Sequence, residues 1–181
     1  MAFTENDTAN LRRKVERLKE VLANTVRYRE TWQNGLKKTI MEQLKALSEV
    51  AGLTFSLEER HEIENLESVV LTLGLEPSGL REPVGGEIQR DLIKQNGSLV
   101  YQQLFNGKIL VIINLPYIEK YGQPQQPRTL AIYRPEELKE AYFLQHLETF
   151  VTDVSNWEDY DDETPEPNQR IGFKLNFENQ K

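Results

Sequence analysis

The fold is decided by residues 98–115, which read SLVYQQLFNGKILVIINL. Two apolar segments meet there at Asn106-Gly107, a dipeptide that is typical of a two-residue type I′ turn because both residues tolerate a positive φ. Such a turn places Leu104 opposite Ile109. The stretch therefore predicts a β-hairpin around which the rest of the chain is organised.

The two strands of this hairpin differ in the polar residues that they carry. Residues 109–113 are all apolar, and an apolar run without alternation indicates an internal strand that is covered on both faces. Residues 99–105 place Gln102 and Gln103 on opposite faces, so we expect this strand to lie nearer an edge of the sheet. Other segments of the chain must then supply a cover for each face.

Apolar side chains recur every three or four residues in the N-terminal part of the chain, as they do on one face of an α-helix. The series is Leu11, Val15, Leu18, Leu22, Val26, Trp32, Leu36, Ile40, Leu44, Leu47 and Ala51. Its phase continues across Asn34-Gly35, which favours one long helix, kinked there, over a helical hairpin that turns at these two residues. Gly52 is placed to end the helix.

A helix over residues 8–51 is about 65 Å long at ~1.5 Å per residue, which exceeds the dimensions of a compact domain of this size. Its apolar face then needs a second chain, or its own fold-back, to cover it. The steady phase favours straight helix packing over a long left-handed coiled coil. We therefore expect at least a dimer, with Leu18, Leu22, Trp32 and Leu36 at the contact.

Shorter elements are expected between this helix and the hairpin. Alternating residues predict a strand over residues 53–57, with a helix toward Asn65 as the alternative. Residues 66–75 have a clearer strand pattern. Proline and glycine then indicate a loop over residues 80–97, in which residues 87–94 are interpreted as a short helix.

After the hairpin, residues 129–133 predict another strand, and Pro135 at a first helical position opens a second main helix. One face of this helix is apolar and is expected to cover one side of the sheet; it carries Phe143, Leu147, Phe150, Val151, Val154 and Trp157. Residues 159–168 are acidic and contain proline, as surface linkers do. Apolar and polar residues alternate over residues 171–177, which predicts a last strand with one solvent-exposed face.

This order contains no strand–helix–strand repeat, which favours an antiparallel sheet over a parallel one. The predicted fold is therefore α+β, with a long N-terminal helix followed by a mostly antiparallel sheet of about five to six strands and a C-terminal helix packed on one face. We interpret residues 1–51 as a helical arm and residues 52–181 as the α+β body of a single domain.

The composition limits the classes of function. Cysteine is absent from the 181 residues, which excludes disulfides, thiolate catalysis and zinc–thiolate sites. Residues 1–50 carry ten Lys or Arg against seven Asp or Glu, and residues 51–181 carry twelve against twenty-two. Mixed signs make the arm a poor phosphate-binding surface, so we expect no nucleic-acid partner. With no signal peptide and no apolar run of about 20 residues, we expect no membrane partner and a cytoplasmic location.

No motif in the sequence marks a catalytic, metal or cofactor site. His61-Glu62 resembles the start of a metalloprotease helix motif, but the second histidine is missing because Asn65 stands in its place. His146 lies at the edge of an apolar helix face, where a packed side chain is the ordinary outcome. The acidic residues at 159–163 lack the glycine and glutamate spacing of an EF-hand. We therefore expect no enzyme activity, no metal and no cofactor.

The loop over residues 116–127 carries residue types that often form binding hot spots, namely Tyr117 and Tyr121, with Arg128 directly after it. We treat these three as partner-binding candidates beside the arm. The favoured function is a non-catalytic interaction or assembly protein that self-associates or binds a partner protein through its N-terminal helix. The alternative is a small-ligand-binding or sensory α+β module, which requires a pocket lined by convergent polar groups.

Overall fold

The computed structural model describes residues 5–160 of the chain. Its helical elements are α1 (Glu5–Thr31), the π turn η1 (Trp32–Leu36), α2 (Lys37–Ala51), the 3-10 turn η2 (Pro135–Glu137) and α3 (Glu140–Glu158). Its strands are β1 (Ser56–Arg60), β2 (Ser68–Thr72), β3 (Leu75–Gly85), β4 (Ile88–Gln95), β5 (Ser98–Gln103), β6 (Ile109–Asn114), β7 (Tyr117–Ile118) and β8 (Arg128–Tyr133). They form a five-stranded sheet in the order β1-β2-β5-β6-β8 and a three-stranded sheet in the order β3-β4-β7.

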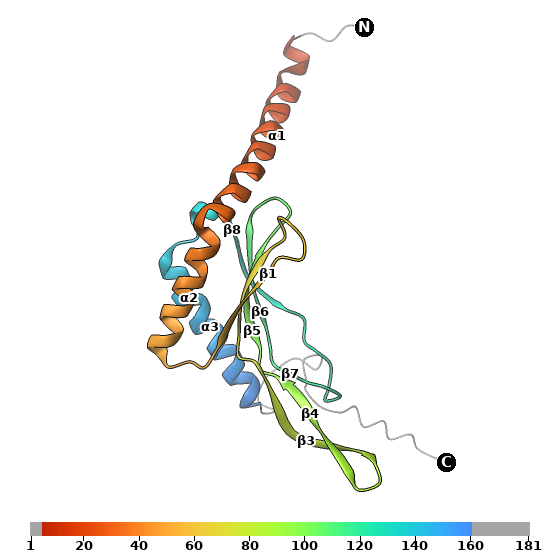
Figure 1. Ribbon diagram of the computed structural model, residues 1–181. Coiled ribbons are helices and arrows are strands. Elements are labelled where there is room, and N and C mark those ends of the chain that lie inside the picture. The colour runs from red at the N-terminus through yellow and green to blue at the C-terminus, as the bar shows by residue number, and fades with distance from the viewer. Residues whose placement is uncertain (1–4, 161–181) are drawn as a thin grey trace, which may run out of the picture.

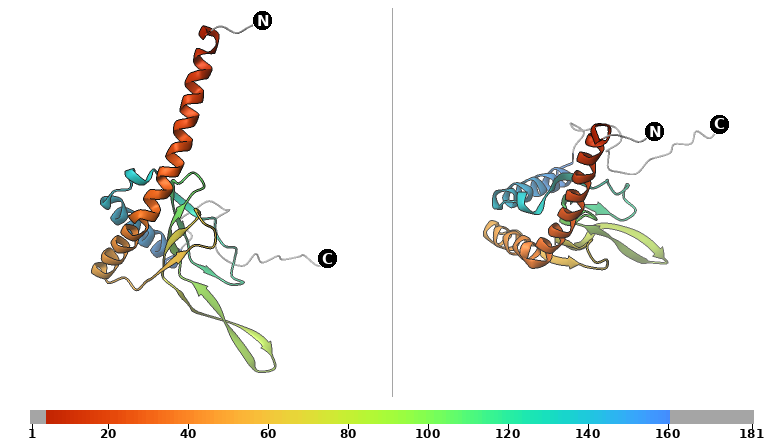
Figure 2. Two further views of the ribbon diagram at one scale, coloured as in Figure 1. Left: turned by 45° about the horizontal axis from the view of Figure 1, so that its top comes forward. Right: turned by 90° about the horizontal axis from the view of Figure 1, so that it is seen from above.

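All strand pairs of the two sheets are antiparallel, and the α+β class with a long N-terminal helix and a C-terminal helix is confirmed. Helices α2 and α3 lie on the same face of the five-stranded sheet (Figure 1, Figure 2). Each presents an apolar stripe to the sheet, and the core between them includes Ile40, Leu44, Phe143 and Phe150, all at most 1% exposed. Helix α1 and the β3–β4 hairpin project from opposite ends of this body.

Strand β6 is an internal strand, flanked by β5 and β8. Its residues Ile109, Val111 and Ile113 are fully buried, whereas Leu110 and Ile112 on the other face are only half-buried. The expectation of a full cover on both faces is therefore wrong for the second face. Both packed helices lie on the first face, and the unbroken apolar run also reflects the preference of β-branched residues for strands.

Strand β5 is the middle strand of the five, so the expectation that it lies nearer an edge is wrong. Of its two glutamines, Gln102 is half-buried, and the buried side-chain nitrogen and oxygen of Gln103 have no hydrogen-bond partner in the described part of the chain. The Gln102 amide donates to the backbone carbonyl of Leu66 over 2.7 Å, and Gln103 is fully buried. A glutamine that finds carbonyl acceptors is compatible with an interior strand, and a polarity pattern cannot show such a partner.

The turn between β5 and β6 is not the predicted type I′ turn. Gln103 pairs with Ile109, and the Gly107 N–H donates to the Leu104 carbonyl over 2.8 Å. In this turn only Gly107 has a positive φ, of 76°. These features are those of a type I turn followed by a glycine bulge, which closes a three-residue loop. The register is therefore shifted by one residue from the predicted Leu104–Ile109 pair.

The long N-terminal helix, kinked at Asn34-Gly35, is confirmed. The π turn η1 interrupts the rod there, and the Gly35 backbone, at φ 160° and ψ −26°, is not helical. A π turn inserts one residue into an α-helix and is a recognised cause of kinks. Helices α1 and α2 therefore point in different directions (Figure 1). Gly52 ends α2 at φ 72°, as expected of a left-handed cap.

The predicted short helix over residues 87–94 is wrong, because these residues form β4 in a long hairpin with β3. The hairpin turns at Gly85 and Gly86, which both have a positive φ. Exposed charged pairs cross between the two strands in place of apolar alternation, namely Arg81–Asp91 at 2.9 Å and Arg90–Glu82 at 2.6 Å. Such pairs support a two-stranded ribbon, but they leave no apolar period in the sequence.

The strand predicted over residues 129–133 is confirmed as β8. The strand predicted over residues 66–75 is confirmed in its middle part as β2, whereas Leu75 already belongs to β3 of the second sheet. The strand predicted over residues 53–57 is present as β1, which starts three residues later, at Ser56. The second main helix begins later than Pro135, because η2 is followed by an extended backbone at Leu138 before α3 starts. The strand predicted over residues 171–177 lies outside the described residues.

Candidate functional site

Helix α1 carries a row of exposed apolar side chains. Its N-terminal part extends beyond the body (Figure 1 and the left view of Figure 2). Leu11, Val15, Leu18 and Leu22 on this part are between 40% and 61% exposed, and we call these four residues the arm stripe. They follow one another at intervals of four, three and four residues, so they share one face of the helix. A row of exposed apolar side chains of this kind is a candidate interaction site.

The other faces of the arm carry many charged residues, together with exposed Ala9, Val21 and Ala23. Ion pairs run along the helix between residues three positions apart, at 2.7 Å for Lys19 and Glu16 and at 2.6 Å for Arg17 and Glu20. Exposed pairs of this kind stabilise a helix by only about 0.2–0.5 kcal/mol each. The arm is thus an amphipathic helix whose apolar face is open.

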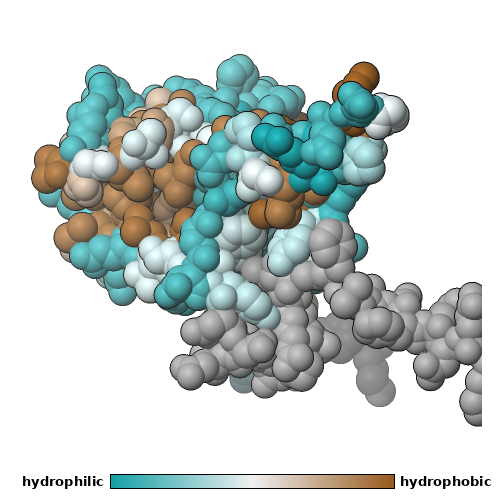
Figure 3. Space-filling view, turned by 90° about the horizontal axis from the view of Figure 1, so that it is seen from below, coloured by the Kyte–Doolittle hydropathy of each residue, from teal (hydrophilic) through white to brown (hydrophobic). Residues whose placement is uncertain are grey.

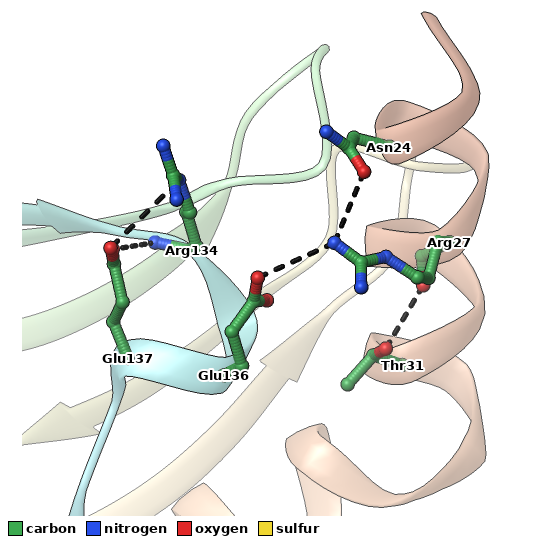
Figure 4. Close-up of polar contacts among 6 residues, drawn as sticks. All are labelled: Asn24, Arg27, Thr31, Arg134, Glu136 and Glu137. Carbon is green, nitrogen blue, oxygen red and sulfur yellow. Dashed lines mark hydrogen bonds and ion pairs between the residues drawn. The ribbon is translucent and has the colours of Figure 1, made fainter. Parts of the chain in front are cut away.

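The base of the arm lies directly against the tip of the β5–β6 hairpin. The Arg29 guanidinium donates to the backbone carbonyl of Phe105 over 2.7 Å. Gly107 approaches the helix so closely that a Cβ atom on it would lie 2.7 Å from the Cβ of Tyr28. On a neighbouring face, Arg27 points toward Glu136 of η2, 3.4 Å away (Figure 4). Because exposed ion pairs are weak, the packed hairpin tip is what fixes the direction of the arm.

A buried carboxylate anchors the π turn to the sheet. Glu67 is 8% exposed and accepts hydrogen bonds from Trp32 Nε1 at 3.0 Å and from Gln33 Nε2 at 2.9 Å. Lys37 lies 3.5 Å from the same carboxylate. Burial acts to raise the pKa of Glu67, but the hydrogen bonds and the charge of Lys37 outweigh it and hold this pKa below its usual value. The bend of the helical rod is therefore held by an ionised, well-bonded group.

The structure separates the four arm residues that the sequence grouped at one contact. Leu18 and Leu22 belong to the exposed arm stripe. Trp32 is fully buried and Leu36 is partly buried against the same core, so the body of the chain itself covers them. The apolar period could not show this division, because it has the same phase on both sides of the point where the body begins.

The candidate residues of the loop lie apart from the arm. Tyr117 of β7 pairs with Gln95 of β4, and both Tyr117 and Tyr121 are half-buried. Arg128 opens β8 and contacts Asp153 of α3 at 2.6 Å. Strand β7 lies beside the β3–β4 hairpin, whereas α1 leaves the opposite end of the body (Figure 1). A role of these residues in partner binding stays a prediction.

One buried polar cluster has no signal in the sequence. His146 of α3 lies between two tyrosines, with its Nδ1 2.9 Å from the Tyr101 hydroxyl and its Nε2 2.9 Å from the Tyr133 hydroxyl. Burial lowers the pKa of His146 to about 4, so the ring is neutral at neutral pH. With one nitrogen donating and the other accepting, the ring joins α3 to β5 and β8. We therefore interpret His146 as a structural residue that links the helix to the sheet.

Among residues 5–160, no three or more His, Asp or Glu side chains are grouped so that they could hold a metal ion. In the same part of the chain, none of the helices combines the length and the apolar character that crossing a membrane requires.

A second apolar surface lies at the side of the body where α2 and α3 run, as the brown area of Figure 3 shows. On these two helices, Val50 of α2 is 91% exposed and Val151 of α3 is 39% exposed. We assign this surface no role, because no described contact shows what covers it.

Comparisons with protein-family models, with curated proteins and with solved structures found no match.

Proposed function

We propose that the protein is a non-catalytic assembly protein that self-associates through the arm stripe. The observation that carries this proposal is the exposure of Leu18 at 56% and Leu22 at 59% on a helix that extends beyond the body. Single exposed apolar residues are ordinary, but a continuous row of them is not. A second helix along the stripe would remove four half-exposed side chains per chain from water, each contributing about 1 kcal/mol.

A second copy of the chain suits the arm stripe well. Leu and Val side chains occupy all four positions, and rows of this kind interdigitate when two helices cross at a small angle. The stripe contains no charged residue, so self-pairing places no charge at its centre. On a straight helix, an apolar row with a seven-residue repeat rotates around the axis by about 20° per heptad. The arm stripe has only four side chains, so this rotation stays small. A straight pair and a supercoiled pair of helices therefore bury the same residues.

The polar clusters of the body support a non-catalytic reading. Glu67 and His146 both use their hydrogen-bonding atoms on side chains of the same chain, so these contacts hold the fold. The alternative, a small-ligand-binding or sensory module, stays a prediction. The cytoplasmic location also stays a prediction.

The test is the mass of the full chain in solution, measured by light scattering after size exclusion. We expect twice the chain mass of 21.1 kDa at micromolar concentration. The double variant Leu18→Glu, Leu22→Glu should be monomeric and keep the wild-type circular dichroism spectrum, because both side chains are more than half exposed. A matched control is Ala9→Glu, Ala23→Glu, since both alanines are exposed and lie away from the stripe at ~100° per residue.

The control variant should remain a dimer. A wild-type mass of 21.1 kDa throughout this concentration range would contradict self-association. A dimer that persists in the Leu18→Glu, Leu22→Glu variant would contradict the assignment of the contact to the arm stripe.

A further inference from the structure

The helix face that carries the arm stripe is occupied by the body one turn further along. The intervals of the stripe continue from Leu22 to Thr25 and Arg29, three and four residues on. At these positions the face is taken by the hairpin tip, since a Cβ on Gly107 would lie 3.0 Å from the Thr25 carbonyl oxygen and 3.2 Å from the Arg29 nitrogen. The hairpin tip therefore occupies part of this helix face from Thr25 onward, although Val26 on the same face stays 56% exposed. Before Thr25 the face is open to solvent.

This continuity restricts how a second copy can lie on the arm stripe. In a parallel pair, equal residues of the two helices stand at the same level, so the two hairpin tips would meet between the helices at Thr25. Paired helices pack with their axes about 8–10 Å apart, a gap that their own side chains already fill. A parallel pair would also place Lys14 of one chain beside Lys19 of the other, and like charges there are unfavourable.

An antiparallel pair reduces this collision, because the two bodies then lie at opposite ends of the helical pair and the two hairpin tips no longer meet each other. Placing Val15 against Leu18 of the second copy also places Leu11 against Leu22 of the second copy, so all four stripe residues are matched. Glu5, where α1 begins, then stands at the level of Tyr28 of the other chain. Only the first turn of each helix reaches the level of the other chain's hairpin tip.

The charges at the two ends of α1 fit the same arrangement. The first turn of the helix carries the acidic residues Glu5 and Asp7, and the base of the arm carries the basic residues Arg27 and Arg29. Antiparallel pairing places each acidic end over the basic base of the other chain. Opposite charges placed in this way favour one orientation, but only weakly, because Glu5 and Arg27 already have the ion-pair partners Arg12 and Glu136 in their own chain.

One kind of like-charge approach occurs in the antiparallel pair, between Arg12 and Lys19 of the second copy, and the twofold symmetry of the pair repeats it once. Each of these cations already has a carboxylate partner on its own helix, Glu5 at 3.4 Å for Arg12 and Glu16 at 2.7 Å for Lys19. Lys14, by contrast, has no ion pair at all in the described part of the chain. The remaining repulsion is therefore smaller than the one that a parallel pair would place at Lys14.

We infer that two copies of this chain pair through their arms in antiparallel orientation, with one body at each end of the helical pair. This inference rests on the proposed self-association and adds its partner, its register and its direction. The contact is the arm stripe of each chain, with Val15 and Leu18 at the centre.

Disulfide cross-linking tests the direction, since the natural chain contains no cysteine. Leu11→Cys and Leu22→Cys are made in two full-length proteins with tags of different mass, mixed under reducing conditions and then oxidised. Leu11 and Leu22 are about 16 Å apart along one helix at ~1.5 Å per residue, whereas a disulfide requires Cα atoms within about 7 Å. We expect cross-links between the two different proteins, at least tenfold in excess over links between identical ones.

The outcomes separate the two levels of the proposal. Links mainly between identical proteins would overturn the antiparallel inference and leave self-association standing. A wild-type protein that is monomeric by light scattering would overturn the proposed function itself. Ala9→Cys and Ala23→Cys serve as off-stripe controls and should form few links in any combination; if they cross-link as well as the stripe pair, the contact does not lie on the arm stripe.

Discussion

The indole N–H of Trp32 donates a hydrogen bond to Oε2 of Glu67 over 3.0 Å. This bond joins the π turn of the helical rod to the residue that precedes β2, and both side chains are largely removed from water. The carboxylate accepts a second bond from Gln33 at 2.9 Å. The place where the rod bends is therefore also the place where it is attached to the sheet.

Replacing Glu67 with Ala should lower the free energy of unfolding by about 3 kcal/mol, because it removes bonds to a charged acceptor and leaves the Trp32 N–H buried without one. Chemical denaturation at pH 7 measures the loss. Glu59→Ala is the matched control, since Glu59 contacts the same Lys37 at 3.0 Å from a more exposed position and should cost less than about 1 kcal/mol. Equal losses in the two variants would contradict an anchoring role for Glu67.

Gly107 should not tolerate a side chain. Gly107→Ala combines a left-handed backbone, at φ 76°, with a Cβ 2.7 Å from that of Tyr28, and we expect a loss of about 2–4 kcal/mol from strain and overpacking together. Gly52→Ala is the control, because Gly52 has φ 72° and open space around it, so only the backbone penalty of about 1–2 kcal/mol applies. If the two variants melt at the same temperature, the hairpin tip does not press on the helix.

His146 should make the protein sensitive to mild acid. Its folded-state pKa, lowered by burial to about 4, lies below the value of about 6.5 in an unfolded chain, so the unfolded state binds the proton first. Stability is then fully present above pH ~6.5 and is lost as the pH falls toward 4, by up to about 3 kcal/mol. A protonated ring would also donate from both nitrogens, so one tyrosine would have to turn its O–H away.

The measurement for His146 is the free energy of unfolding in urea at several pH values. His146→Gln keeps polar atoms in the site but does not titrate, and it should flatten the pH dependence between pH 7 and 4 even if it is less stable overall. Parallel pH curves for the wild type and this variant would show that His146 is not the group responsible.

The two faces of β6 should differ in their response to a charge. Ile113→Asp places a carboxylate in a fully buried position and should abolish soluble folding, because an unpaired buried charge costs several kcal/mol. Ile112→Asp lies on the half-buried face and should give a soluble protein with a lowered melting temperature. Soluble expression followed by thermal denaturation distinguishes the two, and a soluble Ile113→Asp protein would contradict the described core.

The helical part of the fold was predictable because helix periodicity is a strong local signal. The uniform phase across Asn34-Gly35 led to one kinked rod, and Gly52 marked its end correctly. The same uniformity concealed the boundary between arm and body. Trp32 and Leu22 look alike in the periodic pattern, although one is fully buried and the other is exposed, because burial depends on the distant hairpin tip and on Glu67.

The features that sequence reasoning missed depend on partners that are remote in the chain. Gln103 was interpreted as a sign that its strand lies near a solvent-exposed edge of the sheet, yet it is buried in the middle strand. The β3–β4 ribbon is stabilised by cross-strand charges such as Arg90 and Glu82, which carry no apolar period. The contact of His146 with Tyr101 and Tyr133 requires three elements to meet, and no local pattern encodes such a meeting.

Two prolines limit how the outer edge of the three-stranded sheet, at the end of the molecule opposite the arm, can pair with another strand. Pro77 and Pro83 lie in β3, an outer strand of the small sheet, and proline is tolerated in an outer strand because its missing N–H falls on the solvent side. A strand from another molecule would need those donors to extend the sheet. Growth into a fibre by strand addition is therefore disfavoured at this edge, so the longest strand among residues 5–160 does not compete with the arm for neighbouring molecules.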